Sequence, residues 1–236
     1  MRKIDVCFSP ELLPKYEIKD KIVVVVDILR ATSCMVTALA CGVAQIIPVM
    51  EVEECKEWQR KGFLASAERD GKKIEGFDLD NSPYSYQNPA LIGKTIALTT
   101  TNGTLAIKKS KDATQIIIGA FLNISTVIAY LKKENKDILV LCAGWKGKVN
   151  LEDTMFAGAL VEALQADFDV ATDDSLMAQI LYNHAKIDML AVIAKCSHIK
   201  RLQNLGIEKD IDFCFQMDKY SIVPIMKGDF LEIVGQ

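Results

Sequence analysis

The stretch KIVVVVDILRATS, residues 21–33, decides the fold class. Its four consecutive valines, Val23–Val26, are β-branched and do not alternate with polar residues, which is typical of a strand buried on both faces. Polar residues follow at once, and Ser33–Ala40 has a helical pattern. A doubly buried strand that leads into a helix is the repeating unit of a parallel sheet, so this stretch predicts an α/β protein.

The same alternation of strand and helix continues on both sides of this stretch. Short apolar runs predict strands at Ile4–Phe8, Ile22–Asp27, Gln45–Val49, Phe63–Ala67, Thr95–Thr99, Gln115–Ile118, Ile138–Cys142 and Met189–Ile193. Helical patterns occur at Ser33–Ala40, Val52–Lys61, Thr104–Lys109, Ser125–Glu134, Leu151–Gln165 and Leu176–Lys186. We therefore expect a largely parallel or mixed sheet with helices on both faces.

The segment Arg69–Leu91 breaks the alternation and is expected to be a long structured loop of the kind that often carries function. Residues 1–236 are expected to form one α/β unit. A division into lobes 1–119 and 120–236 stays open, because no linker composition marks it.

Composition narrows the class of partner and the compartment. The net charge is −3 and no basic stripe occurs, so nucleic acid is not expected as a partner. No apolar run is long enough for a membrane span. The seven cysteines are odd in number and form no CxxC pair, which indicates reduced thiols and a cytoplasmic protein. The sequence leaves a homo-oligomer open.

Ligands of parallel sheets bind beyond the carboxyl ends of the strands, so the polar residues there are the candidate site. Asp27 ends the valine strand and Arg30, Thr32 and Ser33 open the next helix. Asp27 is a candidate metal or water ligand and Arg30 a candidate anion clamp. The simpler interpretation makes Thr32 or Ser33 a helix cap, but it does not explain an arginine in the first turn, where a cation is disfavoured.

Three further segments follow strands in the same way. TTTNGT, residues 99–104, could cradle a phosphate with its backbone and hydroxyl groups, or could be a turn with a capping threonine; it is not a Walker A loop. CAGWKGKVNLED, residues 142–153, contains a carboxylate pair that suits Mg²⁺, but the spacing alone favours a cap at Asn150 followed by an acidic first helical turn. Glu68 and Arg69 end another strand, where a site and a surface charge pair are equally expected.

Three further ionisable residues of interest lie outside these segments. Asp5 lies in a predicted strand and needs a partner if it is buried. His184 and His198 are far apart in sequence and late in the chain, and a place on a helix surface is expected for each rather than metal ligation.

The segments VVVVDILRATS, AERDGKKIEGFDLDNSP, TTTNGT and CAGWKGKVNLED, in this order and spacing, resemble the 2-phosphosulfolactate phosphatase (ComB) family of coenzyme M biosynthesis. The similarity extends over nearly the whole chain. Asp80 departs from the family, where glycine is expected, so no essential role is assigned to Asp80.

The resemblance implies a three-layer α/β/α enzyme that uses Mg²⁺ to hydrolyse a phosphorylated, sulfonated hydroxy acid, which is a small polyanion. It implies a catalytic set of Asp27, Arg30, Glu68 and Arg69. The expected metal ligands are Asp27, Glu68, Glu152 and Asp153. The expected substrate-binding residues are Thr32, Ser33, Thr100, Thr101, Asn102, Gly103, Thr104, Gly144 and Lys146.

The nucleophile and two other functions stay open at this point. The DxD motif of haloacid-dehalogenase-type phosphatases is absent, so direct attack by water is expected, with an Asp27 phosphoenzyme as the alternative. Asp27, Lys94 and Cys142 could imitate the triad of an isochorismatase-like cysteine hydrolase. A non-catalytic module that binds an anionic metabolite is the other alternative.

Overall fold

The computed structural model describes residues 1–170 and 172–235. Within them, eleven strands form a single sheet in the order β5-β4-β6-β3-β11-β10-β7-β2-β8-β1-β9. The strands are β1 (Arg2–Cys7), β2 (Lys21–Val26), β3 (Gln45–Pro48), β4 (Leu64–Arg69), β5 (Lys72–Lys73), β6 (Thr95–Thr99), β7 (Gln115–Gly119), β8 (Asp137–Cys142), β9 (Phe168–Asp169), β10 (Pro224–Lys227) and β11 (Phe230–Ile233).

The helices connect these strands and then continue as a run of four. They are α1 (Ala31–Ala40), α2 (Val52–Arg60), α3 (Gly103–Lys109), α4 (Ile124–Lys133), α5 (Leu151–Leu164), α6 (Asp173–Ala185), α7 (Met189–Ile193), α8 (Ser197–Gln203) and α9 (Glu208–Cys214). Short 3₁₀ turns are η1 (Leu13–Lys15), η2 (Pro83–Gln87), η3 (Pro89–Leu91) and η4 (Phe121–Asn123). The predicted α/β class is confirmed.

The sheet is mixed because a hairpin joins two parallel groups of strands. In the centre, β2 pairs in parallel with β7 and β8, and β8 pairs in parallel with β1. In the second group, β6 pairs in parallel with β3 and β4. The antiparallel hairpin β10–β11 lies between β7 and β3. β8 therefore separates β1 from β2, so strands from both sides of residue 120 alternate in the sheet; the division into lobes stays a prediction.

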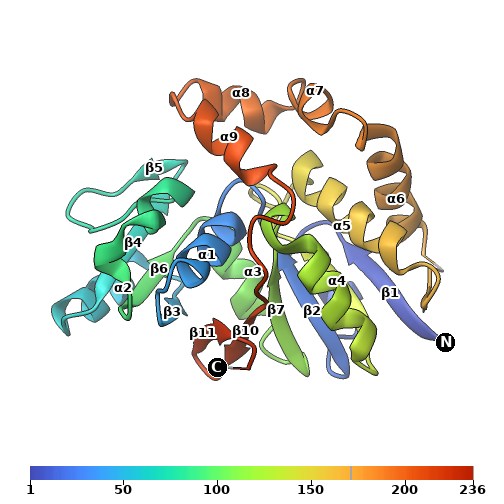
Figure 1. Cartoon of the computed structure of the whole chain (residues 1–236), viewed down its shortest axis with the longest axis horizontal. Coiled ribbons are helices and arrows are strands. Elements are labelled where there is room, and N and C mark those ends of the chain that lie inside the picture. Colours follow the sequence, from blue (N-terminus) through green and yellow to red (C-terminus); the bar gives the residue numbers. More distant parts are fainter. Residues whose placement is uncertain (171, 236) are drawn as a thin grey trace.

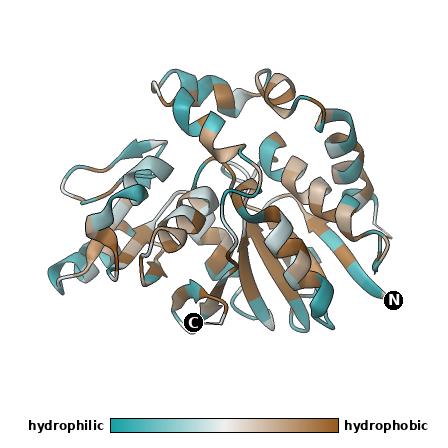
Figure 2. Cartoon of the chain, viewed as in Figure 1, coloured by the Kyte–Doolittle hydropathy of each residue, from teal (hydrophilic) through white to brown (hydrophobic). Residues whose placement is uncertain are grey.

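The buried centre of the sheet follows from its aliphatic strands. Val23–Val26 are completely buried, and Figure 2 shows the central strands as the most hydrophobic part of the chain. Their register aligns Val26 with Gly119 and Cys142, so β2, β7 and β8 end at the same level. The loops that follow these strands are thereby brought to one edge, over which α8 and α9 lie (Figure 1).

One predicted strand is wrong: Met189–Ile193 forms helix α7. The run is short and apolar, and such a run suits a strand or a buried helical turn equally well. Asp188 decides between them locally, because its side chain accepts a hydrogen bond from the backbone N–H of Ala191 at 3.0 Å and caps the helix.

Other expectations are confirmed. All seven cysteines are free thiols. Asp5 has the partner it needs, since Lys21 Nζ lies 2.6 Å from its carboxylate. No helix among the described residues is long and apolar enough to cross a membrane.

Candidate active site

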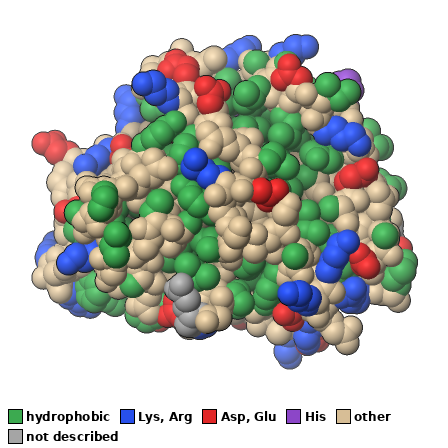
Figure 3. Space-filling view, viewed as in Figure 1, with side chains coloured by type: hydrophobic (Ala, Val, Ile, Leu, Met, Phe, Trp, Pro, Cys, Tyr) green, Lys and Arg blue, Asp and Glu red, His purple; other side chains and the backbone are tan. Residues whose placement is uncertain are grey.

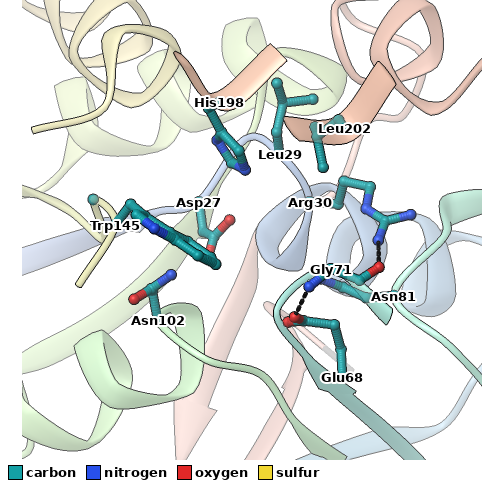
Figure 4. A pocket seen from close by; sticks show the side chains of 11 residues that line it. Asp27, Leu29, Arg30, Glu68, Gly71, Asn81, Asn102, Trp145, His198 and Leu202 are labelled. Carbon is teal, nitrogen blue, oxygen red and sulfur yellow. Dashed lines mark hydrogen bonds between the residues drawn. The ribbon is translucent and has the colours of Figure 1, made fainter. Parts of the chain in front are cut away.

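Loops from four strands and one helix meet in a small pocket at the carboxyl edge of the sheet (Figure 4). The pocket volume is about 20 Å³, which is room for one or two water-sized groups. Figure 4 shows Asp27 and Asn102 on one side and Arg30 and Glu68 on the other. The lining residues are Asp27, Leu29, Arg30, Glu68, Gly71, Asn81, Asn102, Gly144, Trp145, His198 and Leu202.

The turn between β2 and α1 fixes Asp27 at the start of a helix. Thr32 Oγ1 accepts from the Asp27 backbone N–H at 3.1 Å and donates to the Asp27 carbonyl at 2.9 Å. Ser33 Oγ donates to the Ile28 carbonyl at 2.8 Å. Asp27 Oδ1 accepts from the Ala31 backbone N–H at 3.3 Å. The two hydroxyls thus hold the turn, and the carboxylate is the part that faces the pocket.

Arg30 crosses the pocket wall to a partner far along the chain. Its guanidinium forms a buried ion pair with Asp210 of α9 and donates to the Gly71 carbonyl at 3.0 Å. Ser82 Oγ donates to the other Asp210 oxygen at 2.8 Å. The turn between β4 and β5 and the helix α9 are therefore tied to the same arginine, and the loop that follows β5 is tied to Asp210.

The neighbours Glu68 and Arg69 point to different places. Glu68 lines the pocket and accepts from the Gly71 backbone N–H and, at 3.4 Å, from the backbone N–H and hydroxyl of Thr101. Arg69 donates instead to the Met50 carbonyl at 3.0 Å and to Thr99 Oγ1 at 3.1 Å. Alternation along β4 explains the difference, since adjacent side chains of a strand face opposite sides.

The TTTNGT segment is organised mainly by its own hydroxyls. Thr104 Oγ1 donates to the Thr100 carbonyl at 2.9 Å, and the Thr104 backbone N–H donates to Thr100 Oγ1 at 3.3 Å. Gly103 allows a close approach, because a Cβ there would lie 2.5 Å from Ala31 Cβ and 2.9 Å from Asp27 Oδ2. Asn102 is the member of the segment that lines the pocket.

The β8–α5 loop needs glycine where it turns. Gly144 has a φ of +60°, and a Cβ there would lie 2.4 Å from the Lys148 carbonyl. Lys146 donates its backbone N–H to Asn102 Oδ1 at 3.2 Å, while its exposed ammonium lies 2.8 Å from Asp70. Backbone contacts in this loop therefore position Asn102, and the Lys146 charge is already paired.

The carboxylates Glu152 and Asp153 are both buried behind the pocket. Asp153 accepts from the Ile28 backbone N–H at 2.9 Å and from the Gly144 backbone N–H at 3.1 Å, so it joins two of the loops. Glu152 contacts His198 Nδ1 through Oε1. Within the described part of the chain, Glu152 Oε2 has no hydrogen-bond partner.

The expectation that His198 lies on a helix surface is wrong. His198 is buried, contacts Glu152, lies 3.4 Å from the Asn150 amide and stacks on Trp145 with 5.8 Å between ring centroids. His184 is exposed on α6, as expected. No local motif marks His198, because its partner Glu152 lies 46 residues earlier in the sequence.

Burial and charge crowding govern the protonation of the acidic residues. Burial raises the pKa of Asp27 to about 6; nearby His198 and a backbone hydrogen bond oppose this, while Glu68 and Glu152 add to it. Burial, with the charges of Glu152 and Asp27, raises the pKa of Asp153 well above its usual range. The site thus holds more negative charge than its environment stabilises, which is the condition that a bound cation relieves.

The carboxylates of the site differ in how well they could hold a divalent metal. No group of three or more His, Cys, Asp or Glu residues in residues 1–170 and 172–235 is arranged to hold a metal. Each Asp153 oxygen accepts one backbone hydrogen bond and keeps a second lone pair, so its role as a ligand stays a prediction. Asp27 and the unpartnered Glu152 oxygen suit this role, because Mg²⁺ is usually held by one or two carboxylates together with water and substrate oxygens.

Five of the site residues expected from the sequence line the pocket: Asp27, Arg30, Glu68, Asn102 and Gly144. The structure puts the others behind or beside it: Thr32, Ser33, Arg69, Thr100, Thr101, Gly103, Thr104, Lys146, Glu152 and Asp153. It adds Leu29, Gly71, Asn81 and Trp145, which lie in the motifs but were assigned no role, and it adds His198 and Leu202 in the wall and Asp210 behind it, which lie outside the motifs.

An α/β fold with carboxylates, an arginine and a buried histidine around one pocket at the ends of its strands defines an enzyme that acts on a small anion. A family model described as 2-phosphosulpholactate phosphatase matches residues 7–229. The chain belongs to this family.

Similar proteins are spread over several bacteria, and each carries the name probable 2-phosphosulfolactate phosphatase. A protein from Caldanaerobacter subterraneus subsp. tengcongensis is 44% identical over 217 residues, which is 90% of each chain. One from Thermotoga maritima is 41% identical over 221 residues, 93% of this chain and 96% of the relative. One from Clostridium tetani is 37% identical over 233 residues, 97% and 99% respectively.

Proposed function

We propose that this chain hydrolyses 2-phosphosulfolactate, or a closely related phosphorylated hydroxy acid, to the free hydroxy acid and phosphate, with Mg²⁺ as cofactor. The observation that carries the proposal is the convergence of Asp27, Arg30 and Glu68 in one pocket of a chain that belongs to this phosphatase family. The named activity of the relatives supports the substrate class.

The charges around the pocket support a cation as part of the site. The substrate carries phosphate, carboxylate and sulfonate, whereas Asp27 and Glu68 line the pocket and Arg30 is paired with Asp210. A polyanion does not bind beside two carboxylates without added positive charge. In the proposal, Asp27 and Glu152 hold Mg²⁺, which when bound offsets charge on the phosphate and the leaving group.

The chain's own residues divide the remaining work. Arg30 uses N–H groups not spent on Asp210 and Gly71 to hold an anionic oxygen of the substrate. Asn81 lines the pocket, is buried, and its Oδ1 has no hydrogen-bond partner among the described residues, so this oxygen can accept a hydrogen bond from a water in the pocket. Leu29 and Leu202, shown together in Figure 4, exclude water from one side.

Direct attack by water is the proposed chemistry. Glu68 lies across the pocket from Asp27, and its hydrogen bonds to Gly71 and Thr101 fix its orientation (Figure 4). Glu68 takes a proton from the water while the water oxygen bonds to phosphorus. The bond from phosphorus to the hydroxy-acid oxygen then breaks, and the hydroxy-acid oxygen takes a proton from solvent. A covalent adduct of Asp27 trapped with a phosphate mimic would instead establish a phosphoenzyme.

Substrate binding needs room beyond this pocket. The pocket offers about 20 Å³ to water-sized groups and opens to solvent, so a molecule with three anionic groups extends past its wall. His198 and Leu202 close it from α8, a two-turn helix, whereas the opposite wall belongs to the sheet edge. We therefore propose that α8 moves outward when substrate binds.

The seven free thiols also support a cytoplasmic location.

The deciding experiment measures phosphate release from 2-phosphosulfolactate by the purified protein, before and after chelation with EDTA. Activity that is lost on chelation and returns with Mg²⁺ is the expected result. Binding of the substrate without turnover, with or without Mg²⁺, would show a non-catalytic binding module. Turnover that EDTA leaves unchanged would support the phosphatase activity and exclude Mg²⁺ as its cofactor.

A further inference from the structure

Helix α8 turns one side toward the pocket, and that side carries an arginine. His198 and Leu202 are four residues apart, so they lie one above the other on the helix, and both line the pocket (Figure 4). Arg201 lies three residues after His198 and is therefore on the same side. His198 and Leu202 are buried, whereas Arg201 is partly exposed and does not line the pocket itself. Arg201 thus stands at the edge of the pocket.

The Arg201 guanidinium rests on a side chain of the pocket wall. Its Cζ lies 4.5 Å from the ring centroid of Trp145, which is within the range of a cation–π contact. Trp145 lines the pocket and also stacks on His198, so its indole joins the arginine to the wall. The N–H groups of a guanidinium lie in its plane, so a guanidinium that contacts an aromatic ring can still donate to an anion.

Arg201 differs from Arg30 and Lys146, the two cations already assigned to the site, because its charge has no acidic partner. Arg30 pairs with Asp210, and Lys146 pairs with Asp70. The Arg201 side chain has no hydrogen bond or ion pair in the part of the chain that the structure describes. Helix α8 contains no acidic residue, and Figure 3 shows Lys and Arg side chains at the upper edge of the molecule, where Figure 1 draws α8. The charge of Arg201 is therefore available to a ligand.

The proposed substrate carries an anionic group that suits this arginine. A guanidinium binds pairs of anionic oxygens through parallel hydrogen bonds, and a sulfonate presents such pairs as a phosphate does. The guanidinium is also more weakly hydrated than an ammonium, which matches the weakly hydrated sulfonate. Mg²⁺ prefers the hard oxygens of phosphate and carboxylate. With the phosphate in the pocket beside Asp27, the sulfonate is the group left for the pocket edge.

We propose that Arg201 determines specificity by binding the sulfonate of the substrate at the pocket edge, with Trp145 holding the guanidinium in place. This inference rests on the proposed function, because it assigns one group of that substrate. Arg201 does not contact the phosphate that reacts, so its removal raises KM for the sulfonated substrate and leaves kcat nearly unchanged. A site crowded with carboxylates thereby selects a sulfonated substrate over the same molecule without the sulfonate.

The kinetic test compares 2-phosphosulfolactate with 2-phospholactate, which differs from it only by lacking the sulfonate. With 2-phosphosulfolactate, Arg201→Ala should lower kcat/KM about 30-fold, mainly through KM, because a charge-assisted pair is lost. With 2-phospholactate, the same variant should stay within about twofold of the unaltered protein. Lys200→Ala is the matched control, since Lys200 is an exposed cation of the same helix that points about 100° away from Arg201. It should discriminate between the substrates as the unaltered protein does.

A binding measurement tests the contact without turnover. Isothermal titration of the full-length chain with sulfolactate, and with lactate for comparison, should show a preference for sulfolactate. Arg201→Ala should raise the dissociation constant of sulfolactate about 30-fold. Arg201→Lys should raise it about fivefold, since it keeps the charge and the stem on Trp145 but loses the planar fork.

The two measurements separate this inference from the proposed function. If the unaltered protein hydrolyses neither substrate, the proposed function fails, and the sulfolactate titration still decides on Arg201. Sulfolactate bound equally well by Arg201→Ala, or not bound by the unaltered protein, would overturn the sulfonate contact even in an active phosphatase. Equal losses of kcat/KM on both substrates would also overturn it, because they would show that Arg201 supports the fold of the site rather than the sulfonate.

Discussion

Two regions build the pocket in different ways. The first, here called the strand-end frame, comprises the loops at residues 27–33, 68–71, 99–104 and 142–153. The second, the helical cap, comprises α6 to α9, residues 173–214. The frame is held mainly by hydrogen bonds within or between neighbouring loops, such as those of Thr32 to Asp27 and of Asp153 to Ile28. The cap reaches the site through Arg30–Asp210 and Glu152–His198, pairs 180 and 46 residues apart.

The difference indicates a division of work between the regions. The frame sits on a parallel sheet with a completely buried core, so it can hold carboxylates in a fixed arrangement. The cap consists partly of short helices and covers the pocket, so it controls access and supplies counter-charges. Substitutions in the frame should therefore affect chemistry most, and substitutions in the cap should affect stability and access.

The largest expected effect is on the frame, in Asp27→Asn. The change keeps the shape of the side chain and removes its charge, and phosphate release should fall about 1000-fold if Asp27 holds the cofactor. Steady-state kinetics with saturating Mg²⁺ measure it. Asp5→Asn is the control, since Asp5 is partly buried and paired with Lys21 but does not line the pocket. Activity of Asp27→Asn within tenfold of the unaltered protein would exclude the proposed role.

The next effect tests the cap through Asp210→Asn. Arg30 would stay buried without a counter-charge, which costs about 3 kcal/mol in the free energy of unfolding. Urea unfolding measures this cost. Ser82→Ala removes only a hydrogen bond to Asp210 and should cost about 1 kcal/mol. If the free energy of unfolding falls by the same small amount in both variants, the ion pair between Arg30 and Asp210 does not hold the cap on the frame.

A smaller effect concerns the pH dependence of stability in the metal-free protein. The pKa of Asp27 is about 6 in the folded chain and near 3.8 when unfolded, so between these values the folded chain keeps a proton that the unfolded chain has lost. The contribution of Asp27 is greatest below pH 4 and is lost as the pH rises through 6, by about 3 kcal/mol.

Comparison of unfolding free energies for the unaltered chain and Asp27→Asn between pH 4 and 8 isolates this contribution. Asp27→Asn should become relatively more stable as the pH rises, and Mg²⁺ should reverse the difference. A difference that does not change with pH would mean that Asp27 ionises in the folded chain as it does in water, and the frame would then not be electrostatically crowded.

The smallest effect is expected for Cys142→Ser. Cys142 is completely buried at the end of β8, and burial, with the charge of Asp153, raises the pKa of its thiol well above the usual range, so it is not a thiolate at neutral pH. Activity should stay within about twofold of the unaltered protein. Cys55→Ser controls for the cost of burying a hydroxyl. Activity lost only in Cys142→Ser would restore the cysteine-hydrolase interpretation.

The sequence alone determined the fold class and the frame because both depend on local order. Val23–Val26 identify a doubly buried strand, and parallel strands bring the residues that follow them to one edge, so Asp27, Glu68, Asn102 and Gly144 could be placed together from their positions after strands. The order and spacing of the four motifs were sufficient to identify the family.

Only the tertiary structure decided which polar residues face the pocket and which hold it together. Arg69 turns away because β4 alternates its side chains, and the hydroxyls of Thr100 and Thr104 bond to the backbone of their own segment. Asp210 and His198 join the site from segments without a motif, because contacts between residues far apart in sequence leave no local pattern. Sequence periodicity records the environment of a strand or helix, whereas the pairing of two distant charges is set by how those elements pack.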